Sequence, residues 1–313
     1  MALTIVGFAA PYLVAFVAFP LLVKPGAARW RAPFGICLLI VLSPWLVPAS
    51  QPFLRFLASM SAAIAAVKVI DVWLDAHLRT APTRHEYLAF LANPFVYVRR
   101  CLPQERRPSR RENLSNLAMG SLGCAIGVAL LHKLLVLDWH GWPFLLEHVS
   151  KVLTVMLAIT SGLAAAAALW RLWGGTARDY MDKPFTARTP AEFWRRYNRN
   201  MHQFFLHDVF KASGGRRAPL RMTLLVFALS AAMHELVFLA AVGRVQGYQT
   251  AFFALQGLAA VATARVRVKG WVTLPWVAAT LAFNLLSAVF FFASIHAVVP
   301  IYSRGLPQWL QVW

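Results

Sequence analysis

The stretch Met222-Thr-Leu-Leu-Val-Phe-Ala-Leu-Ser-Ala-Ala-Met-His-Glu-Leu-Val-Phe-Leu-Ala-Ala-Val242 decides the fold class of this chain. It is apolar over about 20 residues, the length that an α-helix needs to cross a hydrocarbon core of about 30 Å. Its middle holds an ionisable pair, His234 and Glu235. Ionisable side chains at membrane depth are costly and usually face a protein interior or cavity, so the pair is a candidate functional site. The alternative is a structural His234 that hydrogen-bonds to a neighbouring helix.

The composition of the whole chain is typical of a polytopic membrane protein. Of its 313 residues, 59% are hydrophobic and only 14% are charged, which lies outside the range of soluble globular proteins. The net charge of +19 would indicate nucleic acid in a soluble protein. Here it is better explained by loops that lie against an anionic leaflet of the lipid bilayer, and no nucleic-acid partner is expected.

The apolar pattern predicts an all-α membrane protein with about eight transmembrane helices in a single domain, 1–313. Residues 1–180 would form the N-terminal helices, and 181–313 carry the motifs discussed below. We expect spans at 4–23, 34–49, 53–74, 116–137, 149–172, 222–243, 249–264 and 273–299. If these spans alternate, the basic loops all fall on one side, and the positive-inside rule places them in the cytoplasm and both termini on the opposite side.

Two apolar segments are too short or too polar to cross. Segment 87–98 is flanked by basic residues and is interpreted as re-entrant or interfacial. Segment 193–210 interleaves aromatic residues with charges and is interpreted as an amphipathic helix on the cytoplasmic face.

Several other polar residues receive structural interpretations. Lys68 and Asp71 are spaced i and i+3 in the third span and are expected to form an intramembrane ion pair. His202 and His207, on the amphipathic segment, are expected to be solvated. His296, near the end of the last span, is interpreted as interfacial.

Four motifs in the second half of the chain carry a family resemblance. They are Pro184-Phe185, Phe193-Trp-Arg-Arg-Tyr-Asn198, Ser230-Ala-Ala-Met-His-Glu235 and Phe253-Ala-Leu-Gln-Gly257. In this order the motifs resemble the membrane-bound O-acyltransferase (MBOAT) superfamily, and within it the wax-synthase-like branch of long-chain-alcohol acyltransferases. The resemblance runs from about Asp182 to the C-terminus. One departure is Tyr197, where the family usually has Trp before the Asn.

The resemblance implies transfer of a fatty acyl group from an acyl-CoA thioester to the hydroxyl of a lipophilic acceptor, as in wax ester synthesis. His234 would then be the general base that takes the alcohol proton, and Asn198 the second catalytic residue, through its amide. An ordinary helix cap is the alternative for Asn198. The two share one site only if segment 193–210 dips into a cavity, so we predict a tunnel beside Trp194 and Asn198 that meets near His234 an apolar opening toward lipid.

Supporting roles are expected for the residues around this pair. Glu235 projects about 100° around the helix from His234 and would support the fold or tune the site. Gln256 and Asn284 could hydrogen-bond the imidazole or the thioester carbonyl, or else join helices, and Trp194 belongs to the cytoplasmic motif. The candidates for the phosphates of acyl-CoA are Arg195, Arg196, Arg199 and Lys211, although the same charges also serve to fix topology.

Neither a cofactor nor a metal is expected. The chain has no Gly-rich phosphate loop after a strand and no carboxylate cluster, and Cys37, Cys101 and Cys124 form neither a disulfide pattern nor a zinc site. Two other functions stay open. One is MBOAT-type acylation of a polysaccharide, a protein or a secondary metabolite. The other is a transporter with His234 and Glu235 as a proton relay, which predicts repeats or broken helices that the sequence does not display.

Overall fold

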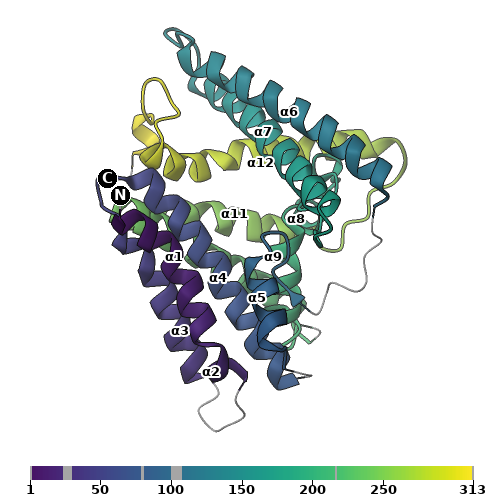
Figure 1. The fold of residues 1–313 in the computed structure, drawn as a ribbon. Helices are drawn as coiled ribbons and strands as arrows, with labels where there is room; N and C mark the ends of the chain where they lie inside the picture. Colours follow the sequence, from purple (N-terminus) through teal and green to yellow (C-terminus); the bar gives the residue numbers. More distant parts are fainter. Residues whose placement is uncertain (1, 24–29, 79–80, 100–107, 216, 312–313) are drawn as a thin grey trace.

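The computed structural model describes residues 2–23, 30–78, 81–99, 108–215 and 217–311 of the chain. In these ranges every regular element is a helix (Figure 1). The longer helices are α1 (Ala2–Val17), α3 (Arg31–Leu42), α4 (Pro52–Leu78), α5 (Arg84–Ala92), α6 (Arg110–Val136), α7 (Phe144–Leu172), α10 (Pro219–Val242), α11 (Tyr248–Thr263) and α12 (Thr273–Val298). The short elements are α2 (Phe19–Val23), η1 (Ser43–Leu46), η3 (Pro184–Thr186), α8 (Pro190–Arg196), α9 (Arg199–Phe204), η4 (Phe205–Phe210), η5 (Gly270–Val272) and η6 (Gln308–Leu310).

The all-α, multi-pass character expected from the sequence is confirmed, but the number of eight spans is not. Among the described residues, five helices are long and apolar enough to cross a membrane: Pro52–Ala76, Arg110–Val136, Phe144–Leu172, Pro219–Val242 and Gly270–Val298. Helices α1 and α11 have 16 residues each, about 24 Å at 1.5 Å per residue, which is short of a core of about 30 Å. Which side of the membrane each loop occupies stays a prediction, and the basic stretches at 24–29 and 100–107 lie outside the described residues.

Helix α10 lies in the middle of the helix packing. Helix α4 packs on one side of it, with α1 and α3 beyond, and α11 packs on the other side. The order then continues from α11 to α12, α7 and α6, and Figure 1 shows α6 and α7 as a long hairpin at one edge. The helix that carries His234 therefore packs between α4 and α11, and α11 carries Gln256.

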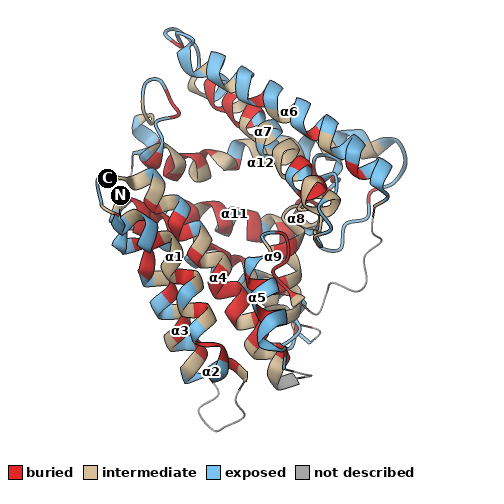
Figure 2. Ribbon diagram, viewed as in Figure 1, coloured by how far each residue is buried: buried red, intermediate tan, exposed pale blue. Residues whose placement is uncertain are grey.

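The α6–α7 hairpin is held by small residues that let the two backbones approach closely. A Cβ added at Gly120 would lie 2.7 Å from the Ser161 carbonyl oxygen, and one at Gly127 would lie 2.6 Å from the Ala158 nitrogen. Figure 2 shows that most of α6 is exposed, which is the pattern of a helix whose apolar outer face meets lipid.

The segment after α4 is fixed to that helix by buried charges, and here one expectation was wrong. Lys68 was expected to pair with Asp71, but its ammonium donates to the carbonyl oxygens of Phe90 (2.8 Å) and Leu91 (3.1 Å), at the C-terminal end of α5. Asp71 accepts from the backbone nitrogen of Arg99 (2.8 Å). Lys68 is attracted to this end of α5 because the last carbonyls of a helix have no partner within it and carry its negative dipole end.

The anchored segment contains helix α5, which lies in the region expected to be re-entrant or interfacial. It has nine residues, about 13 Å, and so cannot cross the core alone. Arg99, beyond it, pairs with Asp75 at 2.8 Å.

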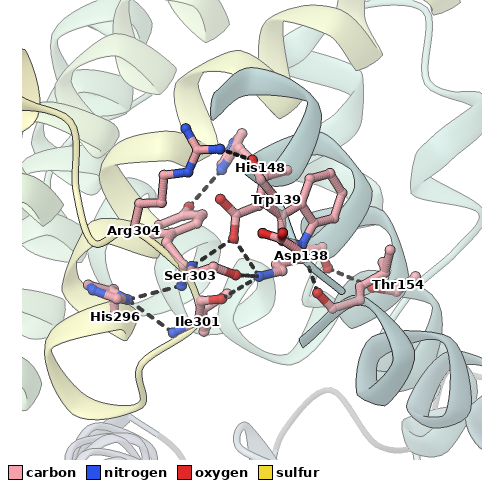
Figure 3. A network of polar contacts seen from close by, with 12 residues as sticks. Asp138, Trp139, His148, Thr154, His296, Ile301, Ser303 and Arg304 are labelled. Atoms are coloured by element: carbon pink, nitrogen blue, oxygen red, sulfur yellow. Dashed lines mark hydrogen bonds and ion pairs between the residues drawn. The ribbon is translucent and has the colours of Figure 1, made fainter. Parts of the chain in front are cut away.

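A second polar network, which the sequence did not reveal, ties the start of α7 to the C-terminal segment (Figure 3). Lys151 and Glu147 form a buried ion pair at 2.5 Å, and Lys151 also donates to the Ile301 carbonyl at 2.7 Å. Nearby, His148 bonds through Nδ1 to the Tyr302 hydroxyl (2.7 Å) and through Nε2 to the Leu285 carbonyl (2.8 Å). Both nitrogens of this histidine are satisfied, so we assign it a structural role.

Two further expectations concern His296 and the three cysteines. His296, expected at the interface, accepts through Nδ1 from the backbone nitrogens of Ile301 and Tyr302 at 3.0 and 3.2 Å. Cys37 and Cys124 are free thiols. Cys101 lies outside the described residues.

Gly127→Ala tests the close packing of the hairpin. The new methyl group collides with the backbone of Ala158, and forced overpacking typically costs about 1–3 kcal/mol. We expect a lower midpoint of thermal unfolding in detergent, although alanine favours helix by roughly 1 kcal/mol over glycine. The matched control is Gly35→Ala on α3, where no atom lies within 4 Å of the added Cβ. Equal midpoints for the two variants would contradict the packing argument.

Candidate active site

His234 lies on α10 and is held in one tautomer by its own helix. Its Nδ1 lies 2.8 Å from the Ser230 carbonyl oxygen, one turn earlier. A carbonyl can only accept, so Nδ1 carries the proton and Nε2 of the neutral ring keeps its lone pair. Among the described residues Nε2 has no hydrogen-bond partner. The imidazole is thus oriented with an unoccupied basic nitrogen.

Aromatic rings from two other helices form walls around this imidazole. The ring centroid of His234 lies 4.5 Å from that of Phe253 on α11 and 5.9 Å from that of Phe291 on α12. Phe253 also contacts Trp194 on α8, with centroids 5.9 Å apart. The Phe-Trp motif and the His-Glu motif, 40 residues apart in sequence, therefore both contact one phenyl ring.

A ladder of hydrogen bonds links three of the expected supporting residues. Nε1 of Trp194 donates to Oε1 of Gln256 at 2.9 Å. Nε2 of Gln256 then donates to Oγ of Ser287 at 2.8 Å and to Oδ1 of Asn284 at 3.3 Å. The ladder joins α8, α11 and α12, so the helix-joining interpretation of both amides fits the structure. Neither amide contacts the imidazole directly.

Glu235 faces away from His234 and supports the fold. Its carboxylate accepts from the backbone nitrogen of Thr250 at 3.1 Å and from that of Gln246 at 3.4 Å. Thr250 is in the first turn of α11, where a negative charge is favourable because unpaired N–H groups and the positive dipole end lie there. Glu235 therefore fixes the start of the helix that carries Phe253 and Gln256.

Asn198 breaks the segment that was expected to form one amphipathic helix. The residue has φ +41°, a left-handed conformation that Asn tolerates better than most residues. Helix α8 ends before it, and α9 begins after it with Asn198 as its cap, since Oδ1 accepts from the Met201 nitrogen at 3.3 Å. The cap interpretation is correct for Oδ1, and it leaves the amide nitrogen of Asn198 available to a substrate.

No hydrogen bond joins Asn198 to His234, but a residue close to each of them in sequence packs on one apolar cluster. Met201, which Asn198 caps, and Met233, which precedes His234, both pack against the cluster of Val67, Tyr97, Val98, Phe204 and Phe205. An apolar cavity of about 200 Å³ borders this region, lined by residues such as Ala62, Ala66, Phe204, Met233 and Val237. Asn198, Trp194 and His234 do not line it. The tunnel predicted beside them stays a prediction.

The four basic candidates differ in how they are used. Arg195 is exposed, and Lys211 is exposed with Nζ 3.5 Å from Nδ1 of His207. The backbone nitrogen of Arg199 donates to the Tyr180 carbonyl at 2.7 Å. Arg196 already pairs with Glu192 (2.5 Å) and donates to the Thr186 hydroxyl (2.8 Å), so it holds the loop before α8 together.

His202 is not solvated as expected. It is half-buried, and burial, together with the positive charges of Arg195, Arg199 and Arg178, lowers its pKa to about 4. The imidazole is therefore neutral at physiological pH, in a region that otherwise concentrates positive charge. Such a region fits an anionic ligand.

The comparison with known families places the match on this part of the chain. The model of the family described as MBOAT, membrane-bound O-acyltransferase family, matches residues 127–296, more than half of the 313 residues. The matched range contains both Asn198 and His234. No curated protein sequence matches the chain.

The lowered pKa of His202 predicts a loss of stability in acid. Between the usual histidine pKa of about 6.5 and the folded value of about 4, the unfolded state binds a proton that the folded state does not. The contribution of His202 is therefore complete above pH 6.5 and is lost as the pH falls toward 4. We expect the unfolding midpoint of wild type to fall more between pH 7 and pH 4.5 than that of His202→Asn. If the unfolding midpoints of the two proteins fell equally over this pH range, the lowered pKa of His202 would be contradicted.

Proposed function

This chain belongs to the membrane-bound O-acyltransferase family, and we propose that it transfers a fatty acyl group from acyl-CoA to the hydroxyl of a lipophilic alcohol. The family implies O-acyl transfer within a membrane. The proposal adds the thioester donor, the wax-ester type of acceptor and the catalytic residues. It requires no cofactor and no metal.

One observation carries the proposal: Nε2 of His234 has no hydrogen-bond partner among the described residues. The Ser230 carbonyl, 2.8 Å from Nδ1, fixes the ring and its proton, so a lone pair is presented on the other side of the imidazole. A general base needs such an oriented lone pair within reach of the hydroxyl that it activates. The ring centroid of Phe253 lies 4.5 Å from that of the imidazole, so the phenyl ring would help to keep water from this nitrogen.

The proposed reaction uses the imidazole twice. Nε2 takes the hydroxyl proton of the acceptor while the alcohol oxygen forms a bond to the thioester carbon. The bond from that carbon to sulfur then breaks, and the imidazolium returns the proton to the sulfur, which leaves as the thiol of coenzyme A. Asn198 would donate from its amide nitrogen to the substrate, because its oxygen is engaged with Met201.

The substrate classes are supported by the surroundings of the site. Arg195, Arg199 and Lys211 are proposed to bind the phosphates of the donor, with Arg196 in a structural role through Glu192. The apolar cavity of about 200 Å³ supports a lipophilic substrate, since a dry apolar cavity of roughly 150 Å³ in another protein holds benzene. A polysaccharide, protein or secondary-metabolite acceptor is the alternative.

The reaction itself is tested with purified protein and a labelled long-chain acyl-CoA. The acceptors offered are long-chain alcohols, sterols, diacylglycerol and a soluble sugar. We expect an ester of a long-chain alcohol by mass spectrometry, with free thiol released in equal amount. Ester formation on the sugar alone would move the function to the alternative acceptor class, and proton transport into vesicles without any ester would replace the enzyme by a transporter.

His234→Ala tests the base. The variant should insert and fold, while turnover falls by the ~10²–10⁴-fold that loss of a general base typically costs. The matched control is His132→Ala, an exposed histidine on membrane helix α6, which should keep wild-type turnover. A well-folded His234→Ala protein with normal activity would refute the mechanism.

A further inference from the structure

The amide orientations in the ladder follow from its first member. The indole N–H of Trp194 can only donate, so the Gln256 atom at 2.9 Å must be the oxygen. The other end of the Gln256 amide is then the nitrogen, which needs acceptors and finds them at Ser287 and Asn284. The Asn284 atom at 3.3 Å is therefore Oδ1. The orientation of the Asn284 amide thus follows from the indole N–H of Trp194, which can only donate.

This orientation leaves one hydrogen-bond donor unused. Nδ2 of Asn284 is buried and has no hydrogen-bond partner within the described part of the chain. Ser287, its neighbour one turn on, does satisfy its own hydroxyl on the Phe283 carbonyl at 2.7 Å. Buried amide nitrogens nearly always have an acceptor, so an unpaired one calls for an explanation.

The position of Asn284 points to a substrate atom as that acceptor. Gln256 is three residues from Phe253 on α11, about 4.5 Å along the helix axis, and Asn284 is seven residues from Phe291 on α12, about 10 Å. Phe253 and Phe291 are the two walls of the His234 imidazole. The ladder thus joins Trp194 on α8 to the two helices, α11 and α12, whose phenyl rings wall the imidazole of the proposed base.

We propose that Nδ2 of Asn284 donates a hydrogen bond to the carbonyl oxygen of the acyl thioester, with Gln256 as the residue that positions it. The inference rests on the proposed function and adds a second amide to it. As the alcohol oxygen attacks the carbonyl carbon, the carbonyl oxygen gains negative charge, and a neutral N–H donor that is already oriented stabilises that charge without reorganisation. The charge is removed when the bond to sulfur breaks and the carbonyl reforms.

The test compares Asn284→Asp with wild type in the ester assay. Aspartate has nearly the same shape but no amide donor, so we expect kcat to fall by about 10²–10³-fold, the usual effect of losing one oxyanion donor. The KM for acyl-CoA should change little, because the interaction strengthens only in the transition state. Asn284→Leu, which has no polar atom, should lose kcat to the same extent and replaces the aspartate variant if that one does not fold.

Gln256→Glu separates positioning from packing. A glutamate still accepts from Trp194 but can no longer donate to Asn284, which frees the amide to turn and donate to the carboxylate. We expect a loss of kcat in this variant, and no further loss when Asn284→Asp is added, because both changes remove one and the same donor. A purely structural ladder would instead give additive losses of thermal stability and unchanged kcat in the folded fraction.

Ser294→Ala is the matched control, since Ser294 is on the same helix, fully buried and also without a partner for its hydroxyl within the described residues. It should behave as wild type. Folded Asn284→Asp protein with wild-type kcat, beside an inactive His234→Ala, would overturn the inference and leave the proposed function standing. Wild-type protein without ester synthesis, or an active His234→Ala variant, would overturn both.

Discussion

The hydrocarbon core of a membrane offers no hydrogen-bond partners, so each polar side chain on a spanning helix has to find its partner inside the protein. That constraint organises this structure. Lys68 reaches the last carbonyls of α5, Glu235 caps the first turn of α11, and Lys151 and Glu147 pair with each other and with the C-terminal segment. Each of these contacts joins a long helix to a shorter element and so sets where the short elements lie.

The candidate site stands out against this background because its polar atoms are satisfied on one side only. Nδ1 of His234 donates a hydrogen bond to the Ser230 carbonyl of its own helix, and Nε2 has no hydrogen-bond partner among the described residues. Asn198 uses its oxygen as a cap, and Asn284 uses its oxygen within the ladder. Three side chains thus retain nitrogen atoms for the roles proposed above, His234 as the base and Asn198 and Asn284 as amide donors. By contrast, His148 is satisfied at both nitrogens and carries no such capacity.

The α8–α9 corner brings the two motifs together. The left-handed conformation of Asn198, with φ +41°, separates α8 from α9, so that segment 193–210 is not one continuous helix. Trp194 on α8 packs on Phe253 and donates to Gln256. Burial, together with the positive charges of nearby basic residues, lowers the pKa of His202 and keeps it neutral, and the proposed function assigns that positive charge to the binding of an anionic donor.

The sequence by itself determined the class of the protein, its family and the residues of interest. Composition and runs of about 20 apolar residues are local properties that specify membrane helices, and the order of Phe-Trp, Asn198 and His-Glu carries the family. Sequence did not determine the number of spans, since α1 and α11 proved short. Nor did it reveal the partner of Lys68 or the kink at Asn198, because these depend on which carbonyls and dipoles another element brings near. The tautomer of His234, the contact of both motifs with Phe253 and the unpaired nitrogen of Asn284 were decided only by the tertiary structure, because hydrogen-bond geometry arises between helices that are far apart in the chain.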